Sequence, residues 1–484
     1  MATASGDSNQ TFDVIIVGAG ISGINCAYRL QTECPGTKFI VLESRDQIGG
    51  TWDQFRFPGV RSDSDLYSYG FAWHDWPFEQ FYGDGPQILE YMHDAISAHK
   101  LEKYIKRRHL VLSSSWQSSN SRWELTVDHG GRLIRFIARF IVLGTGHIDH
   151  NSLPSVEIPG IDNFGGRVIS PQFWPRDYDY EGERVAVIGS GATAVTMLPH
   201  LAKKAMQISL IQRSPTYVVV AAGSGWLQKF LPLKWVARSR RFLNTISLHI
   251  AALFCAFFPN MSKKMLLKET AKRLPEWIDP SFDFEPRYNP GEQRLCLDPD
   301  GKFYSALHLE NVRVMTGNIK NVVKGGILMQ DGQSVDVDVI VMATGFRMRL
   351  GGGIQIKVNG NSMSWSKRLV WNGAMLDGVP NMIFMLGYPN NAWTLRADDT
   401  AFILVRLLSH MDRQGAKVAV PLAPESEGLQ TQVVWKSSAT YVLAAQDELP
   451  VCGMTGPWKP RVSPPIDRLR ARWGDITSGL HLDG

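Results

Sequence analysis

The sequence predicts an α/β protein with two Rossmann-like dinucleotide-binding domains, one inserted into the other, and an inserted helical region. The first observation behind this prediction is a repeated order of strand pattern, glycine-rich turn and helix pattern, in TFDVIIVGAGISGINCAYRL and again in ERVAVIGSGATAVTMLPHL. The second is the length of 484 residues, which exceeds one ordinary domain. The third is a pair of apolar runs, RFIVLGTGH and VDVIVMATGF, which share a Thr-Gly ending.

These observations divide the chain into three parts. We expect the first domain to begin in residues 1–155, the inserted domain to occupy 156–335 with helices near 225–280, and the chain to return over 336–484 to the first domain and a C-terminal region. The two Thr-Gly runs mark the places where the chain leaves the first domain and re-enters it.

Composition narrows the class of protein. The hydrophobic share of 44% and charged share of 20% are those of an ordinary globular chain. The start, MATASGDSNQ, lacks the basic and apolar parts of a signal peptide, so we expect a cytoplasmic protein. Five cysteines without a CxxC spacing argue against a disulfide framework or a zinc site. A net charge of +5 without a basic block argues against a nucleic-acid partner.

The first glycine-rich turn is a complete GxGxxG. Gly18 allows the tight turn, Gly20 admits a pyrophosphate to the backbone, and Gly23 lets the helix pack on the strand. Glu43 follows Gly23 by twenty residues at the end of the next strand, where a carboxylate accepts hydrogen bonds from a ribose diol. An N-terminal unit of this kind is the usual location of FAD.

The second turn predicts a different nucleotide. It carries Gly189, Gly191, Ala192 and Thr193. An alanine, at position 194, stands where a GxGxxG motif has its third glycine. The strand that follows ends at Arg213 instead of an acid, and an arginine there accommodates a 2′-phosphate. We therefore expect NADPH as the second cofactor and a flavoprotein that NADPH reduces. The alternative is an arginine that is merely solvated at a strand end.

One apolar segment, FLNTISLHIAALFCAFFPN at 242–260, requires a membrane test. Its almost wholly apolar part, residues 246–258, is too short for a helix to cross the bilayer, because a span needs about 20 residues at 1.5 Å each. We therefore expect no transmembrane span. Two interpretations stay open: a buried or interdomain helix, and a helix that lies weakly on a membrane surface.

Taken together, the ordered motifs resemble a known family over residues 12–460. The family comprises the FAD- and NADPH-dependent Baeyer–Villiger flavoprotein monooxygenases, and the likeness is strongest to the ethionamide-monooxygenase branch. The segments that carry the resemblance are GAGISG, LESRDQIGGTW, FPGVRSDSDLYSYGF, FGGRVISPQFWP, VIGSGATAVTMLP, QRSPTYVV, NPGEQRLCLDPDGKFYSAL, MATGF and LGYPNNAWTLRADDT.

The resemblance implies a reaction and its residues. In this family oxygen adds at flavin C4a, and the resulting peroxide anion inserts one oxygen beside a ketone carbonyl to give an ester or lactone. Arg294 matches the active-site arginine and Asp63 the aspartate that pairs with it. The further cofactor contacts that we expect are Gly50, Thr51, Trp52 and Tyr67. Trp52 and Tyr67 would flank the flavin, although an aromatic at either position is equally consistent with plain core.

Two departures leave the reaction class open. The family's connector fingerprint has a histidine where this chain has Ser170, between the matching Phe164, Gly166, Trp174 and Pro175. Gln293 stands where many relatives carry a lysine for the 2′-phosphate. The alternatives are oxygenation at sulfur or nitrogen, an oxidase or dehydrogenase reaction with altered NADPH coupling, and a non-enzymatic role. The expected partners are O₂ and a lipophilic carbonyl compound, such as a bulky ketone of secondary metabolism.

Overall fold

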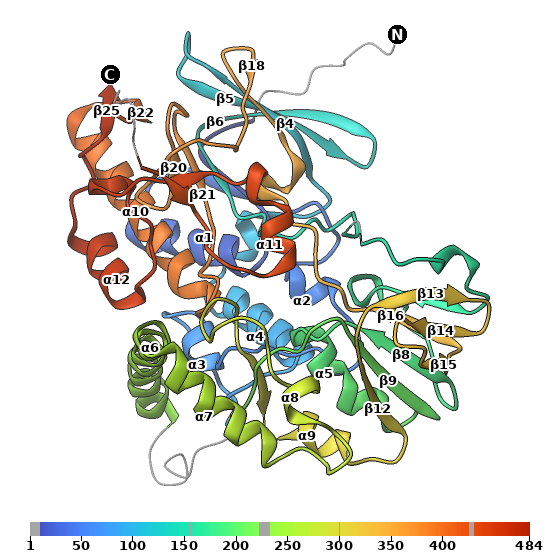
Figure 1. The fold of residues 1–484 in the computed structure, drawn as a ribbon. Helices are drawn as coiled ribbons and strands as arrows, with labels where there is room; N and C mark the ends of the chain where they lie inside the picture. The colour runs from blue at the N-terminus through green and yellow to red at the C-terminus, as the bar shows by residue number, and fades with distance from the viewer. Residues whose placement is uncertain (1–9, 155, 222–232, 300, 425–429) are drawn as a thin grey trace.

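The computed structural model describes residues 10–154, 156–221, 233–299, 301–424 and 430–484, and it contains two large sheets (Figure 1). The first sheet mixes parallel and antiparallel pairs. Its strands, in spatial order, are β18 (Asn361–Ser362), β17 (Gln355–Val358), β4 (Leu110–Gln117), β5 (Arg122–His129), β6 (Arg132–Leu143), β1 (Gln10–Val17), β2 (Phe39–Leu42) and β3 (Ile105–Lys106), and β21 (Met382–Phe384) also pairs with β6.

The second sheet has five strands, and every pair in it is parallel. Its order is β12 (Val312–Thr316), β9 (Gln207–Gln212), β8 (Arg184–Ile188), β16 (Val339–Met342) and β7 (Arg167–Ile169). Strand β16 lies beyond the expected end of the inserted domain at residue 335, so this sheet takes one of its inner strands from the segment assigned to the returning chain. Two Rossmann-like sheets, one formed within an insertion of the other, confirm the predicted fold class.

Helices cover these sheets. The longer ones are α1 (Ile21–Glu33), α4 (Gly85–Ala98), α5 (Ala192–Leu201), α10 (Trp393–Gln414) and α12 (Pro464–Trp473). Short helices are α2 (Thr51–Gln54), α3 (Leu66–Tyr69), α8 (Pro280–Asp283), α9 (Lys302–Leu307) and α11 (Thr440–Ala444). Small sheets pair β10 (Val218–Ala221) with β11 (Cys296–Pro299), β19 (Val370–Trp371) with β20 (Met375–Leu376), β22 (Val418–Pro421) with β25 (Leu480–Asp483) and β23 (Gln432–Val433) with β24 (Val451–Cys452), and join β13 (Ile319–Val323), β14 (Gly326–Met329) and β15 (Ser334–Asp336).

The predicted helical insertion is present as α6 (Leu233–Phe257) and α7 (Pro259–Ala271), and its first expected residues, 225–232, lie outside the described part. Pro259 opens α7, where a proline fits because the first helical turn needs no backbone donor. Among the described residues no single helix is long and apolar enough to cross a membrane. Ser239–Phe257 and Pro259–Ala271 reach that composition only as a pair, bent by 113°.

The two crossings between the domains lie side by side. Ile148 and Met348 form an antiparallel bridge. Next to it, the Asp149 amide donates to the Arg347 carbonyl at 2.8 Å and the Arg349 amide to the His147 carbonyl at 2.9 Å. The chain therefore passes between the two sheets as a short paired ribbon.

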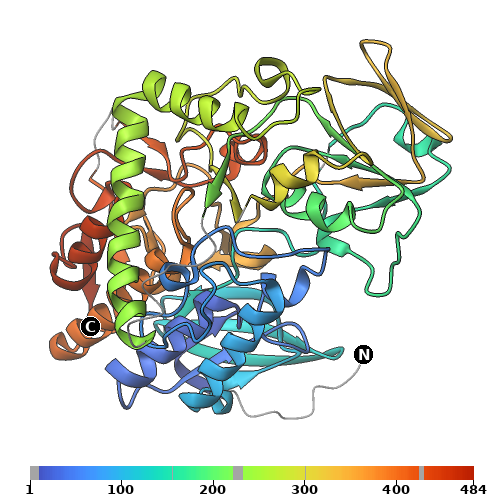
Figure 2. The ribbon, with the colours of Figure 1, turned by 90° about the horizontal axis from the view of Figure 1, so that it is seen from below.

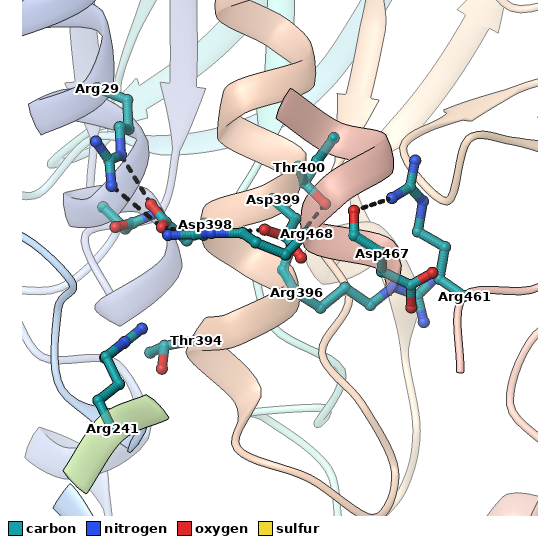
Figure 3. A network of polar contacts seen from close by, with 12 residues as sticks. Arg29, Arg241, Thr394, Arg396, Asp398, Asp399, Thr400, Arg461, Asp467 and Arg468 are labelled. Atoms are coloured by element: carbon teal, nitrogen blue, oxygen red, sulfur yellow. Dashed lines mark hydrogen bonds and ion pairs between the residues drawn. The ribbon is translucent and has the colours of Figure 1, made fainter. Parts of the chain in front are cut away.

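A buried ion-pair network joins three helices of the first domain (Figure 3). Arg29 of α1 donates from Nε to Asp398 Oδ1 at 2.8 Å and from Nη2 to Oδ2 at 3.1 Å. Arg468 of α12 donates to Asp398 at 2.6 Å and to Asp399 at 2.9 Å. Both carboxylates belong to α10 and are almost fully buried. The network therefore fastens both α1 and α12 to α10.

Candidate active site

The first glycine-rich turn lies where β1 meets α1, at one end of a cavity of about 530 Å³. Gly18 has φ +101°, and a β-carbon there would lie 2.8 Å from the Gly144 carbonyl oxygen, so only glycine suits this turn. A β-carbon at Gly23 would overlap the Gly18 carbonyl. Gly18 and Gly20 line the cavity, whereas Gly23 serves the packing of helix on strand.

The cavity matches an anionic dinucleotide. Helix α1 begins after Gly20 without a side-chain cap, so the backbone N–H groups of its first turn have no capping partner from a side chain and Ile21 and Ser22 line the cavity. Gly50 faces this turn, and a β-carbon at Gly50 would lie 3.1 Å from the Gly20 α-carbon. Two glycines packed this closely leave the backbone bare of side chains at the cavity wall, which is what close approach of a pyrophosphate requires.

Glu43 is the residue predicted to contact the ribose of this nucleotide. It follows β2, is buried, and lines the same cavity. Its Oε2 accepts from the Ala19 backbone amide at 2.7 Å, and its Oε1 accepts from the Arg45 amide at 3.0 Å. These bonds hold the carboxylate beside the glycine-rich turn, where a ribose next to the pyrophosphate would lie.

Aromatic residues form another wall. Trp52 and Thr51, at the start of α2, line the cavity, and Trp52 donates to the hydroxyl of Tyr69 at 2.7 Å. Tyr69 lines the cavity, whereas the expected contact Tyr67 does not: it belongs to the hydrophobic core beside Phe81. Tyr67 and Tyr69 are two residues apart on a four-residue helix, so their side chains point to different faces. The sequence motif alone did not show which of the two faces the cavity.

Asp63 and Arg294 meet although 231 residues separate them. Arg294 Nη2 donates to Asp63 Oδ1 at 2.8 Å and Nε lies 2.7 Å from Oδ2, which is the bidentate geometry that suits a guanidinium and a carboxylate. Arg294 also donates to the hydroxyl of Ser64 at 2.6 Å and to the Asn391 carbonyl at 3.3 Å. Both charged side chains keep about a third of their surface accessible, at 34% and 30%.

The pair acts electrostatically on the cavity wall. Burial, together with the smaller effects of the charges of His150 and Arg294, lowers the pKa of the His147 imidazole to about 3. Burial also raises the pKa of Tyr69, with Asp63 adding to the rise and Arg294 opposing it. His147 and Tyr69 both line the cavity, so the ion pair lies within electrostatic reach of it, and His147 is uncharged at neutral pH.

The second glycine-rich turn lies between β8 and α5. Gly189 has φ +134°, and Gly191, Ala192 and Thr193 begin α5 with no side-chain cap. Arg213 directly follows β9, is exposed, and donates to the Thr440 hydroxyl at 3.3 Å. Gln293 donates to the Ser438 carbonyl at 3.2 Å. The structure thus brings Arg213 and Gln293 to the same segment, 438–440, which nothing in the sequence motifs indicated.

Ser170 has a capping role in the connector. Its hydroxyl accepts from the Gln172 amide at 3.3 Å and caps the short turn Pro171–Phe173. Gln172 then donates to the Asp149 carbonyl at 2.7 Å, and Trp174 is buried among the core of the second domain. The connector 164–175 is therefore anchored at both ends, and its link to the crossing ribbon passes through Gln172.

The segment 147–150 carries side chains of the types that bind metals, His147, Asp149 and His150. Among the described residues no group of three His, Cys, Asp or Glu side chains is placed to hold a metal ion. Within the segment 147–150, His147 stacks on Trp393 at 4.7 Å, Asp149 pairs with Arg349 at 3.3 Å, and His150 bonds Gln54. The sequence reasoning missed His147 and Trp393 as cavity residues because neither belongs to a nucleotide motif.

Comparison with known proteins gives three findings. The family described as flavin-binding monooxygenase-like matches residues 12–352. The FAD-containing monooxygenase EthA of Mycolicibacterium smegmatis is 38% identical over 93% of this chain and 92% of its own. Two solved structures share the fold: OTEMO with FAD and NADP, at a TM-score of 0.76 and 20% identity, and cyclohexanone monooxygenase with ε-caprolactone, at 0.77 and 21%; each alignment covers 98% of this chain and 100% of the other.

These matches agree with the fold. The family model covers both glycine-rich turns and the Asp63–Arg294 pair, and the relative extends over nearly the whole chain. The predicted flavoprotein is confirmed as a flavin-dependent monooxygenase. The chain belongs to the flavin-binding monooxygenase-like family.

Proposed function

We propose that this protein uses FAD and NADPH to insert one oxygen atom of O₂ beside the carbonyl of a lipophilic ketone, giving an ester or lactone. The observation that carries the proposal is the bidentate Asp63–Arg294 pair within electrostatic reach of the cavity. Further support comes from cyclohexanone monooxygenase, which shares the fold and was crystallised with a lactone.

In this proposal the first glycine-rich turn holds FAD. The N-terminal amides of α1 face the pyrophosphate, Glu43 accepts from the ribose, and Trp52 with Tyr69 borders the ring system. Bound FAD, once reduced by NADPH, supplies the electrons that activate O₂. The protein supplies the position of the nucleotides, a cavity wall of aromatic rings and a fixed positive charge.

Arg294 supplies that charge. A guanidinium stays protonated at every working pH, so it stabilises negative charge on the oxygen being transferred without taking up or releasing a proton. Asp63 holds two of its nitrogens and Ser64 adds a third contact, which fixes the plane of the group before substrate arrives. His147, uncharged and stacked on Trp393, leaves the permanent charge of Arg294 unopposed on that side.

Arg213 is expected to select NADPH over NADH. In the variant Arg213→Gln the 2′-phosphate loses a charge-assisted hydrogen bond, a loss of about 1.5–3 kcal/mol or roughly a 10- to 100-fold rise in KM for NADPH. The KM for NADH stays unchanged. Steady-state oxidation of both nucleotides measures this, with Lys204→Gln, an exposed lysine of the same domain, as the control. Equal rises for both nucleotides would contradict a phosphate contact.

Glu43 is expected to determine FAD retention. The isosteric variant Glu43→Gln removes the charge that accepts from the ribose, so the affinity for FAD falls about 10- to 100-fold. Flavin absorbance of the purified protein, followed by titration with FAD, measures the loss. Asp46→Asn is the matched control because that carboxylate is 63% exposed at the surface. Full flavin content in Glu43→Gln would place the ribose elsewhere.

The second candidate function is oxygenation at sulfur or nitrogen, or an oxidase or dehydrogenase reaction with altered NADPH coupling. Ser170 motivates it, because a hydroxyl that caps a turn lacks the charge and reach of the imidazole in the family fingerprint. The mass of the product separates these reactions. A ketone that gains one oxygen supports Baeyer–Villiger insertion, a sulfoxide or N-oxide supports the heteroatom reaction, and the loss of two hydrogens supports dehydrogenation.

The proposal is tested by mixing the protein anaerobically with NADPH and candidate ketones and following flavin absorbance. Oxygen is then admitted and the products are weighed by mass spectrometry. Reduction followed by an ester or lactone supports the proposal, and reduction followed only by hydrogen peroxide with every apolar ketone contradicts it.

A further inference from the structure

Three polar side chains in the described part of α6 contact the rest of the protein. Arg241 donates to the carbonyls of Tyr67 and Gly70 at 3.1 and 2.7 Å, and Asn244 donates to Asp65 at 3.0 Å. Farther along, His249 lies 3.2 Å from the hydroxyl of Ser463, which precedes α12. The contacts that seat α6 on the first domain are therefore hydrogen bonds.

The side of α6 that points away from Arg241 and Asn244 carries large apolar side chains that face solvent. We call this side the outer face of α6, and it comprises Phe242, Leu243, Ile250, Leu253 and Phe257. Their spacing places them within one stripe of the helix at 100° per residue. Phe242 is 66% exposed, Ile250 60% and Phe257 73%. A surface helix of a globular protein normally has the reverse orientation, with its apolar stripe inward.

Neighbouring helices also expose large apolar side chains. Helix α7 has the exposed Met261 and Met265 directly after the bend. Helix α12, next to the His249–Ser463 contact of α6, exposes Ile466, Leu469 and Trp473, and Val462 just before it is exposed too. In both ribbon views α6 and α12 lie along the same edge of the molecule (Figure 2). Large apolar side chains exposed on neighbouring helices at one edge of the molecule indicate a binding partner.

Positive charge borders this surface. Lys264 and Lys268, both exposed, share the side of α7 that carries Met261 and Met265, one helical turn apart. Within α7, which the structure describes in full, the single acid Glu269 is already paired with Lys272 and Arg273. Over residues 239–257 of α6 the sequence has no acid at all. Apolar side chains beside lysines fit an anionic lipid surface, where the rings enter the acyl boundary and the ammonium groups meet the headgroups.

We propose that the surface formed by α6, α7 and the exposed apolar side chains of α12 docks on an anionic membrane. A second copy of the chain fits it less well, because a two-fold interface sets the same patch against itself and would bring the α7 lysines toward those of the partner. The inner side of α6 bonds Asp65 and Tyr67, close in sequence to Asp63. A docked enzyme therefore receives lipophilic compounds from the bilayer near its site, which extends the proposed function to membrane-dissolved substrates.

Vesicle flotation tests the docking without any turnover. The full chain is mixed with vesicles of phosphatidylcholine and with vesicles of equal phosphatidylcholine and phosphatidylglycerol. We expect it to float with the anionic vesicles only, and less so at high salt. The double variant Ile250→Ser/Phe257→Ser is expected to bind at least about tenfold more weakly, because two large apolar groups no longer enter the boundary. Lys264→Glu/Lys268→Glu is expected to lose the preference for anionic lipid.

The control is Leu133→Ser/Met206→Ser, two apolar residues that are 64% and 63% exposed elsewhere on the molecule. It should bind vesicles as the wild type does. A wild type that stays unbound, or an outer-face variant that binds like the control, overturns the proposal. Sedimentation that shows a dimer abolished by Ile250→Ser/Phe257→Ser, without vesicle binding, assigns the surface to a second copy instead. Because binding needs no oxygenation, failure here is separable from failure of the proposed reaction.

Discussion

Replacing Arg294 with alanine is expected to lower product formation by about 100- to 1000-fold, the effect of losing one preorganised donor to a developing negative charge. Reduction of the flavin by NADPH should stay at the wild-type rate, because Arg294 contacts Asp63 and Ser64 and neither glycine-rich turn. Anaerobic stopped-flow absorbance measures reduction, and product analysis after admission of oxygen measures transfer.

Two further variants sharpen the Arg294 experiment. Arg287→Ala, at an exposed arginine seven residues earlier, controls for a general loss of positive charge and should leave both rates unchanged. Arg294→Lys keeps the charge but loses the bidentate contact with Asp63, so its oxygenation should fall between those of the wild type and alanine variant. Wild-type oxygenation in Arg294→Ala would remove the basis of the proposed reaction.

Asp398→Asn is expected to lower the free energy of unfolding by about 3–5 kcal/mol, because it removes the buried carboxylate that Arg29 and Arg468 share and leaves them only Glu33 and Asp399. Asp398 accepts from Arg29 and from Arg468, and its side chain is only 2% exposed. The matched control is Asp412→Asn on the same helix, whose carboxylate is 62% exposed beside Arg139 and should change stability by about 0–1 kcal/mol. Urea unfolding followed by tryptophan fluorescence compares the two; equal effects would show that burial does not matter.

The same network predicts a dependence on pH. Burial alone would raise the pKa of Asp398, but the charges of Arg468 and Arg29 outweigh burial and lower it. A carboxyl group whose pKa is lowered on folding stabilises the fold above its unfolded pKa of about 3.9, and the contribution is lost as pH falls below that value. Acid unfolding of the wild type should therefore include a component that Asp398→Asn lacks.

Much of the fold could be predicted from the sequence because its signals are local. A strand, a glycine-rich turn and a helix are adjacent in the chain, so the turns at Gly18 and Gly189 indicate both sheets. The end of the inserted domain was harder to predict from the sequence. Strand β16 pairs with β8, which begins 155 residues earlier, and an apolar run does not state which sheet it will join.

The site divides in the same way. Glu43 was accessible from its spacing after Gly23, whereas Asp63 and Arg294 were paired only through the family resemblance. Tyr69 instead of Tyr67 lines the cavity because of the rotation of one short helix, which packing determines. The direction of α6 could not be predicted either: its composition indicates an amphipathic helix, but the hydrogen bonds of Arg241 decide which side faces outward.

The paired crossings at 147–149 and 347–349 determine how the two lobes can move. Single linkers would allow each lobe to swivel about many axes, whereas a two-stranded strap resists twisting and shear and flexes mainly across its plane. We therefore expect the second domain to rotate relative to the first mainly about a single hinge axis. A nicotinamide nucleotide bound to the second domain would then reach the same position relative to the first domain in every turnover.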